Sequence, residues 1–162
     1  MHYTLKDGDK DKAEGTQSAL QQKLLESRSI VISGEINQAL AEKVITQLIL
    51  LQSVSNDPIK LYINSQGGHV EAGDTIHDFI KFIRPDVHVI GTGWVASAGI
   101  TIFLAAKKEH RYSLPNTRFM IHQPLEKVKK DTDRNFWMSP AEALDYGIVG
   151  KLITHYDDLK LD

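Results

Sequence analysis

The sequence contains no cysteine. This absence excludes disulfide frameworks, thiolate metal sites and cysteine nucleophiles, and it suits a reducing compartment. An excess of charge of one sign is also lacking, because 19 basic side chains stand against 21 acidic ones and the formal net charge is −2. Without a basic excess or a block of like charges, the composition indicates neither a nucleic-acid-binding surface nor a charged interaction tail.

Long hydrophobic runs are missing as well. The longest, such as Ile45–Leu51, are interrupted by polar residues and are too short to span a membrane. The N-terminus is charged from the start and shows no secretory signal pattern. With 162 residues, 41% of them hydrophobic, the chain has the size and composition of one domain with its own core. We therefore expect a cytoplasmic protein that binds neither membrane nor nucleic acid.

Composition divides the chain into two parts. Residues 1–17 carry Lys, Asp, Glu and Gly with few large apolar groups, which predicts a flexible N-terminal arm. Residues 18–162 form the predicted single domain, which opens with a short helix over Ser18–Glu26. From Ser29 onward, short β-rich runs alternate with amphipathic stretches of helical period.

This alternation predicts a sheet covered by helices. Strands are predicted from Arg28 to Gly34 and over Ile59–Asn64, Val87–Gly93, Arg118–His122 and Ile148–Thr154. Helices are predicted over Asn37–Ser53, His69–Ile83, Ala96–Lys107 and Pro140–Tyr146, with a turn at Ser65–Gly68. Strands separated by helices of this length are typical of βαβ units, so the predicted fold class is α/β with a mostly parallel sheet.

Ser97 lies in the most informative stretch, GTGWVASAGI at residues 91–100. A buried strand runs into small residues and then into an apolar helix, so the backbone can turn sharply with the serine at the bend. A hydroxyl beside the amides at a helix start suits a nucleophile next to an oxyanion site. Val95 breaks the strict G-x-S-x-G pattern, and a serine that simply begins a tightly packed helix is the commoner case.

Two further features follow predicted strands. Gly67 and Gly68 can bring backbone N–H groups close to a ligand or can form a plain turn. His122 ends an apolar strand, where a histidine can act as a general base or can be structural. In a parallel sheet these positions and Ser97 meet at one edge, and that convergence favours an acyl-transfer site.

Other chemistries have weaker patterns. No H-x-x-x-H pair occurs and the glycine-rich phosphate-binding motifs are absent, so we expect neither a metal ion nor a nucleotide cofactor. Asp131 and Asp133 resemble part of a cation loop but lack its glycine and distal glutamate, and helix capping is the simpler interpretation. Phe136 and Trp137 are expected in the core or at an interface.

Four stretches of the chain together resemble the proteolytic subunit of caseinolytic protease, ClpP. They are INSQGG at 63–68, GWVASAG at 93–99, RFMIHQP at 118–124 and DTDRNFWMSPAEALDYGIVGKLI at 131–153. The match runs from about Ser29 to Thr154 in the family's order. The resemblance implies a serine peptidase of the crotonase-like α/β fold, without cofactor, whose subunits form heptameric rings that stack into a closed chamber. An AAA+ unfoldase such as ClpX or ClpC feeds such a chamber with unfolded proteins.

The resemblance also implies the site residues, position by position. The family's nucleophile falls on Ser97 and its base on His122. The amides of its oxyanion hole fall on Gly68 and Ala98, and most members have a methionine at the second of these positions.

The third triad position departs from the family. The family pattern places an aspartate there, whereas this chain has Asn135, which can orient the base but offers no charge to the imidazolium. This departure resembles the diverged second ClpP paralogue of bacteria that carry two copies. Gln66 replaces the proline of the family's S-P-G-G turn, and His69 stands where a small or aliphatic residue is usual. Both changes are expected to alter the cleft beside the oxyanion hole.

Docking of the unfoldase is expected to use Tyr62 and Phe82. Both match the lining of the apolar groove that the family forms between neighbouring subunits. Lys60 occupies a position that is aromatic in many members, so we expect this docking to be weakened.

One segment of the family pattern is missing between Pro124 and Leu125. It is the family's handle, a long helix and strand that interdigitate between stacked rings. Either the handle was deleted or this sequence omits it, and omission is favoured because the handle assembles the family's double ring.

Three functions stay in competition. The first is a serine endopeptidase subunit of an ATP-dependent Clp protease in protein quality control, with low basal activity because of Asn135. The second is a catalytically weak regulatory or structural ring subunit that works with a second ClpP paralogue. The third is a crotonase-like acyl-CoA enzyme, which is disfavoured because a Ser97–His122 pair has no role there.

Overall fold

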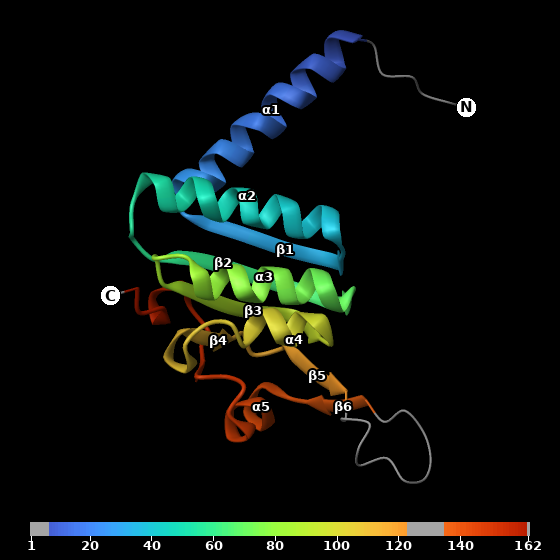
Figure 1. Ribbon diagram of the computed structural model, residues 1–162, viewed down its shortest axis with the longest axis vertical. Coiled ribbons are helices and arrows are strands. Elements are labelled where there is room, and N and C mark those ends of the chain that lie inside the picture. Colours follow the sequence, from blue (N-terminus) through green and yellow to red (C-terminus); the bar gives the residue numbers. More distant parts are fainter. Residues whose placement is uncertain (1–6, 123–134, 162) are drawn as a thin grey trace, which may run out of the picture.

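The computed structural model describes residues 7–122 and 135–161, and Figure 1 labels its elements. The helices are α1 (Asp7–Glu26), α2 (Gln38–Val54), α3 (Val70–Phe82), α4 (Ala98–Phe103) and α5 (Pro140–Tyr146), with 3₁₀ turns at Lys108–His110 and Tyr156–Asp158. The strands are β1 (Ser29–Ile36), β2 (Ile59–Gly68), β3 (Val87–Ala96), β4 (Arg111–Ser113), β5 (Arg118–His122), β6 (Asn135–Met138) and β7 (Lys151–Leu152).

The described strands form one sheet that forks at β3. Its main order is β1-β2-β3-β4-β7, and β5 with β6 extends it from the far half of β3. Val89–Gly91 of β3 pairs with β4, whereas Trp94–Ala96 pairs with β5. Every described pair is parallel except β5–β6. The fork brings the ends of β3 and β5 side by side, and these ends carry Ser97 and His122.

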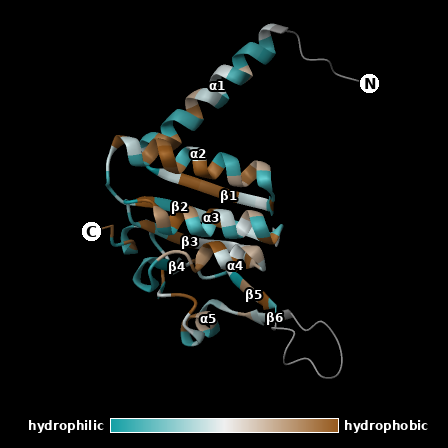
Figure 2. Cartoon of the chain, in the orientation of Figure 1, coloured by the Kyte–Doolittle hydropathy of each residue, from teal (hydrophilic) through white to brown (hydrophobic). Residues whose placement is uncertain are grey.

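Helices α2, α3 and α4 lie next to one another over one face of the sheet (Figure 1). The alternation of β2 explains this layer, because Ile59, Leu61 and Ile63 are fully buried against the helices while the residues between them face the other way. Each helix presents small and aliphatic side chains to these strands, as Val44 and Leu48 do in α2. Figure 2 shows the corresponding hydrophobic colouring of β1 and α2.

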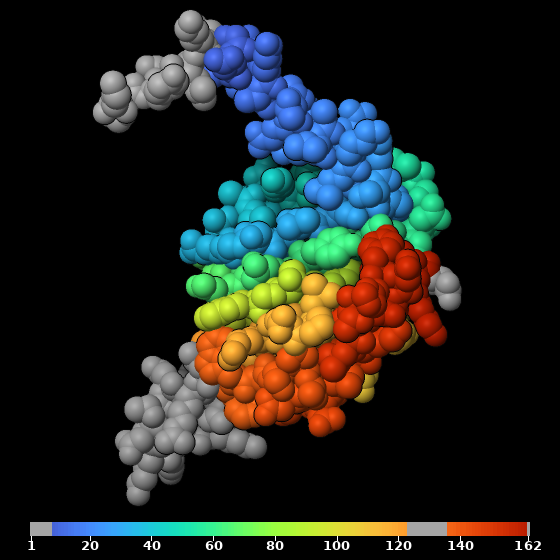
Figure 3. Space-filling model, turned by 180° about the vertical axis from the view of Figure 1, so that it is seen from behind, coloured from blue at the N-terminus to red at the C-terminus, as the bar shows by residue number. Residues whose placement is uncertain are grey.

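The opposite face of the sheet carries a smaller apolar cluster. Its buried members are Ile90, Tyr112 and Ile153, and Tyr62, Leu114 and Leu159 pack against them. The C-terminal segment after α5 lies over this face, as the view from behind shows (Figure 3). Lys60 of β2 donates a hydrogen bond from Nζ to the Tyr156 hydroxyl at 2.9 Å. The C-terminal segment thus covers part of this face, whereas Val31 of β1 is 52% exposed there, and the larger core lies beneath the helices.

The predicted α/β class with a mostly parallel sheet is confirmed. Helix α5 matches its prediction residue for residue, because clear signals mark both ends. Ser139 and Glu142 form a capping box at its start, and Gly147 ends it in the left-handed conformation with φ +93°.

Several boundaries differ from the predictions. Strand β2 continues to Gly68 where a turn is predicted, because the glycines still pair with Glu35 and Ile36 of β1. Helix α4 is confined to Ala98–Phe103, and the last strand to Lys151–Leu152. Strand β4 was not predicted, since three residues are too few to show a period of two.

Helix α1 is longer than predicted. It begins at Asp7, so residues 7–17, which the composition places in a flexible arm, are helical. The helix projects away from the sheet and helices (Figure 1), and the mobility of this arm stays a prediction. Within the ranges 7–122 and 135–161, no helix is both long and apolar enough to cross a bilayer.

Candidate active site

Ser97 occupies the bend between β3 and α4. Its φ and ψ are 54° and −118°, and few residues other than glycine adopt a positive φ. Such a backbone costs of order 1–3 kcal/mol and persists only where its surroundings impose it. Here the Ser97 N–H donates to the Met120 carbonyl of β5 at 3.0 Å. The strand-to-helix bend predicted from the small flanking residues is therefore present, and it leaves the half-buried hydroxyl turned towards β5.

His122 stands at the end of β5, beside Ser97. Parallel pairing of Ala96 with Met120 aligns the two strand ends, and the Nε2 atom of His122 lies 3.0 Å from Ser97 Oγ. The imidazole is exposed. With its proton on Nδ1, this ring can accept the hydroxyl proton at Nε2, which is the arrangement that general-base catalysis needs.

Asn135 is the first residue of β6, and the antiparallel register places it directly opposite His122. Residues directly opposite in an antiparallel pair have Cβ atoms about 4.5–5.5 Å apart. The third residue of the predicted triad is thus held next to the second by backbone pairing alone.

The two glycines at the end of β2 lie against the bend. A Cβ atom added to Gly67 would stand 2.8 Å from Ser97 Cβ and 3.3 Å from the Ala98 nitrogen. A Cβ atom at Gly68 would overlap the Ile36 carbonyl. Both residues also have positive φ, so each position requires glycine for its space and its backbone. Gly67, which the predicted oxyanion pair of Gly68 and Ala98 leaves out, makes the closest approach to the serine.

Ser65 is a second residue that the sequence did not single out. It is 1% exposed, and its hydroxyl bonds to backbone groups of Gly34 and Gly67. A serine between a strand and a Gly-Gly pair has no distinctive pattern, so only the fold identifies its contacts.

An open cavity of about 830 Å³ adjoins the glycines. Its lining combines the ends of β1 and β2 with Trp94 and is mostly polar or backbone: Ser33, Gly34, Glu35, Asn64, Gln66, Gly67, Gly68 and Trp94. Gln66 lines this cavity. The sequence predicts that this glutamine, in place of the family's proline, alters the cleft beside the oxyanion hole, and the cavity wall is where such a change would act. His69 is exposed and precedes α3.

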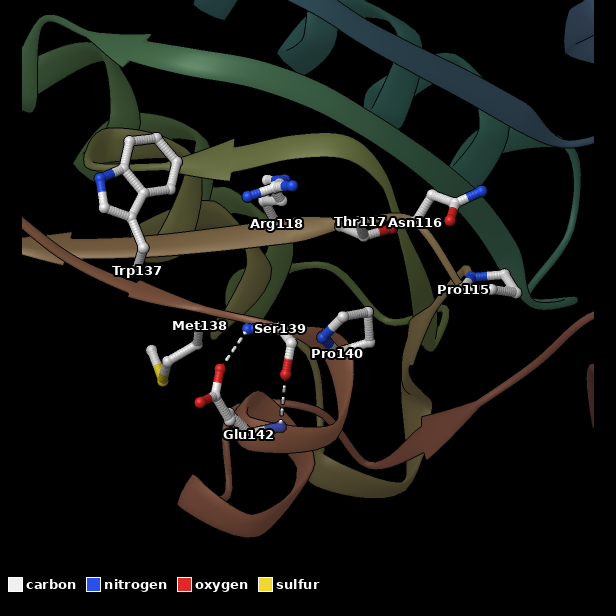
Figure 4. A pocket seen from close by; sticks show the side chains of 9 residues that line it. All are labelled: Pro115, Asn116, Thr117, Arg118, Trp137, Met138, Ser139, Pro140 and Glu142. Atoms are coloured by element: carbon white, nitrogen blue, oxygen red, sulfur yellow. Dashed lines mark hydrogen bonds between the residues drawn. The ribbon is translucent and has the colours of Figure 1, made fainter.

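A second cavity, of about 380 Å³, lies between β5, β6 and the start of α5. Figure 4 shows Ser139 and Glu142, joined by two hydrogen bonds, among the lining residues, which also include Arg118 and Trp137. The bond from the Ser139 backbone N–H to the carboxylate lowers the pKa of Glu142. Both bonds between Ser139 and Glu142 belong to the capping box, so this carboxylate has a structural role. Trp137 also packs edge-on against Trp94, with ring centroids 5.0 Å apart.

The two predicted docking residues lie on opposite sides of the sheet. Tyr62 is half-buried in the cluster beneath the C-terminal segment, and burial raises the pKa of its hydroxyl. Phe82 ends α3 with 79% of its surface exposed. One chain therefore does not join them into a groove, and a groove between neighbouring subunits stays a prediction.

Metal-ligating side chains do not gather in the part of the chain that the structure describes: no three His, Asp or Glu residues there are placed to hold an ion. Asp131 and Asp133 lie outside the described residues.

Comparison with known proteins assigns the family. The family model described as Clp protease matches residues 11–128 and 123–156. The chain is 46% identical to ATP-dependent Clp protease proteolytic subunit 3 of Rhizobium etli, covering 84% of this chain and 89% of that protein. It is 39% identical to ATP-dependent Clp protease proteolytic subunit 2 of Pseudomonas aeruginosa, covering 97% of this chain and 98% of that protein. The chain belongs to the Clp protease family.

Solved structures agree with this assignment. ClpP1 from Listeria monocytogenes is 57% identical and superposes with a TM-score of 0.79, covering 87% of this chain and 99% of that one. An asparagine-to-aspartate mutant of the same protein superposes with a TM-score of 0.80. The fold is thus that of ClpP.

The comparisons also bear on the missing segment. The two stretches matched by the family model meet at residues 123–128, where the sequence predicts the gap. The junction between Pro124 and Leu125 lies outside the described residues.

Proposed function

We propose that this chain is a serine endopeptidase subunit of an ATP-dependent Clp protease. The observation that carries the proposal is the 3.0 Å contact between Ser97 Oγ and His122 Nε2 at a strained strand-to-helix bend. A serine, a histidine within hydrogen-bond reach and backbone amides beside the serine are the minimum set for acyl transfer.

In the proposed reaction Ser97 attacks the peptide carbonyl while His122 accepts its hydroxyl proton at Nε2. The carbonyl oxygen becomes an oxyanion, which the N–H groups of Gly68 and Ala98 stabilise. His122 then gives its proton to the leaving amine, and water hydrolyses the acyl-enzyme by the same route. The approach of Gly67 to Ser97 and to the Ala98 nitrogen supports this placement of the donors.

Asn135 is proposed to orient His122. Its amide oxygen can accept the Nδ1–H of the imidazole, which leaves Nε2 free to act as the base. Rotated by half a turn, the same amide donates to Nδ1 and selects the wrong tautomer. An asparagine therefore supports a lower basal rate than an aspartate does.

Membership of the Clp protease family supports a proposal for how the subunits assemble and how substrates reach them. We propose heptameric rings that stack into a chamber in the cytoplasm and receive unfolded proteins from an AAA+ unfoldase. Tyr62 and Phe82, from opposite sides of the sheet, would form the docking groove across a subunit boundary. Lys60 is held by the Tyr156 hydroxyl and ring, which supports a docking surface more polar than the usual one.

A second candidate function is a regulatory ring subunit that activates a ClpP paralogue. The observation that favours it is the asparagine opposite His122, because loss of the triad charge weakens the imidazolium-forming step.

The proposal is tested by measuring hydrolysis of a fluorogenic peptide by the wild-type protein and by Ser97→Ala. Each protein is measured alone and mixed with a ClpP ring that has an aspartate in its triad. We expect Ser97-dependent hydrolysis, with a loss of at least about 10³-fold in the alanine variant. Stimulation of the partner ring to the same extent by wild type and Ser97→Ala would support the regulatory candidate instead. Absence of any Ser97-dependent hydrolysis in all mixtures would overturn the peptidase proposal.

A further inference from the structure

The end of β2 is irregular on both sides, where it passes between β1 and β3. Its register with β1 shifts between Ser33 and Glu35, and its register with β3 shifts between Ile63 and Ser65. Irregularities of this kind often re-aim a strand beside an active site. The β1 ladder resumes beyond its shift, where Glu35 and Ile36 pair with Gly67 and Gly68. At the shift itself the regular ladder is interrupted, so a side-chain contact there helps to fix the backbone.

Ser65 supplies that contact. Its Oγ donates to the Gly34 carbonyl of β1 at 2.6 Å and accepts the Gly67 N–H at 3.0 Å. The side chain is 1% exposed, so water does not compete for either bond. One hydroxyl thus links the end of β1 to the glycine that touches Ser97.

These bonds also determine which amide faces the bend. The Gly67 N–H is engaged by Ser65, and the His69 N–H donates to the Ile36 carbonyl of β1 at 2.8 Å. Gly67 and Gly68 have positive φ, so regular strand alternation alone does not set their amide directions. The two bonds do show that the N–H groups on either side of Gly68 are both engaged towards β1, and neither bond uses the Gly68 N–H. Gly68, which lies between them, is therefore expected to direct its N–H away from β1, towards Ser97 and the Ala98 nitrogen.

We propose that Ser65 is a positioning residue that aims the Gly68 N–H at the developing oxyanion. This inference rests on the proposed peptidase function and adds to it a residue that does not touch the substrate. Without the hydroxyl, the buried Gly67 N–H and Gly34 carbonyl lose their shared partner, and the Gly67–Gly68 segment can rotate. Since an error of about 1 Å in such a donor can cost 10²-fold in rate, the effect falls on the transition state.

The test compares Ser65→Ala with Ser113→Ala. Ser113 is the matched control, because its hydroxyl is also buried and bonds a backbone carbonyl, that of Leu114, but in β4 away from Ser97. We expect Ser65→Ala to lower kcat by roughly 10–100-fold with little change in KM, and Ser113→Ala to leave both unchanged. All variants are compared in the same assembly state, checked by sedimentation.

A peptide boronic acid gives the second readout. Its tetrahedral serine adduct places an oxygen in the oxyanion hole, so its affinity should fall in Ser65→Ala by about the same factor as kcat/KM. The affinity of the corresponding cleavage product, which has no oxyanion, should not change. Equal kcat and equal boronate affinity in Ser65→Ala and wild type would overturn the inference.

Two further controls keep the outcome decisive. If Ser65→Ala does not fold, Ser65→Cys retains the size but exchanges the hydroxyl for a weak donor and acceptor, and the same losses are expected. If wild type neither hydrolyses peptides nor binds the boronate, the proposed function fails. In that case, amide hydrogen exchange of residues 64–69 tests the positioning role of Ser65 separately. Faster exchange in Ser65→Ala than in Ser113→Ala would support this role, and equal exchange rates would contradict it.

Discussion

Asn135 is the residue at which we expect the chemistry of the proposed triad to differ from that of an aspartate-bearing one. Strand pairing places its backbone directly opposite that of His122. An aspartate can only accept the Nδ1–H, so it selects the productive tautomer and stabilises the imidazolium. In a serine protease, changing the triad aspartate to asparagine lowers kcat by about 10⁴-fold, which corresponds to roughly 5 kcal/mol of transition-state stabilisation.

Asn135→Asp is therefore expected to raise basal turnover, with the main effect on kcat rather than on KM. Steady-state peptide hydrolysis by both proteins in the same assembly state measures it. An aspartate variant no faster than wild type would mean that the amide is already oriented correctly, or that assembly limits the rate.

His88 is a second residue with an unusual environment. It is fully buried, its ring stacks on His110 at a centroid distance of 3.9 Å, and Nδ1 lies 3.3 Å from the Tyr112 hydroxyl. Burial, reinforced by the neighbouring His110, lowers the pKa of His88 from 6.5 to about 4. The Asp86 carboxylate opposes this shift only in part, because it is paired with Lys107 at 2.8 Å.

The folded chain is thus expected to lose stability as pH falls from about 6.5 towards 4. In that window the unfolded His88 binds a proton that the folded one does not, which costs up to about 3 kcal/mol at the acidic end. His88→Phe, which keeps a ring in the stack, should flatten this dependence. Urea unfolding midpoints across the window measure it, with His77→Gln as control. An identical pH dependence in His88→Phe and wild type would disprove the assignment.

At the scale of elements, Arg28 joins the end of α2 to the beginning of β2. It follows α1 with φ +53°, and its guanidinium donates to the carbonyls of Leu51, Ser55 and Asp57 at 2.7–3.1 Å. Its own carbonyl accepts the Lys60 N–H, which begins the β1–β2 ladder. One side chain thus satisfies several carbonyls of the α2–β2 connection.

Arg28→Ala should lower the free energy of unfolding by about 2–3 kcal/mol, because it removes charge-assisted bonds to several carbonyls at once. Arg28→Lys should retain only part of this stabilisation, because the lysine ammonium cannot reproduce the planar set of donors of the guanidinium group. Chemical denaturation measures both. Lys23→Ala, which removes an exposed ion pair with Glu26, is the control and should change little. An Arg28→Ala midpoint equal to that of the control would contradict the role of Arg28.

Long elements with clear ends could be predicted from the sequence, and short irregular ones could not. The apolar period of α2 and the Ser139–Gly147 signals of α5 locate those helices. The three residues of β4 owe their extended shape to pairing with β3 and β7, a tertiary effect with no local pattern. The extension of β2 through Gly68 was missed because Gly-Gly is a turn signal unless a neighbouring strand holds it.

The site itself could be predicted only in part. Ser97, His122 and the glycine pair lie at the carboxyl ends of strands, so a parallel sheet gathers them at one edge. The contribution of Gly67 and Ser65 could not be predicted, because it depends on the fork of β3 and on the register shifts of β2. Both features arise from how strands pair across the whole molecule.

At the scale of the whole molecule, the proposed function places the site in an assembly of subunits. Several large apolar side chains are exposed, including Val54 and Phe82 at 79% each, and such surfaces suit contacts between subunits. If the handle is absent from the protein, single rings should predominate. Sedimentation measures this, and a fully populated double ring at low concentration would contradict it.

The most direct test of the central claim is intact-mass analysis of the native particle after reaction with a fluorophosphonate. Attack by Ser97 Oγ on phosphorus displaces fluoride, and His122 takes the hydroxyl proton. We predict one adduct per chain, carried by the peptide that contains Ser97, slowed in His122→Gln and absent in Ser97→Ala. An adduct on another residue, or none under conditions that label a known serine protease completely, would contradict the account.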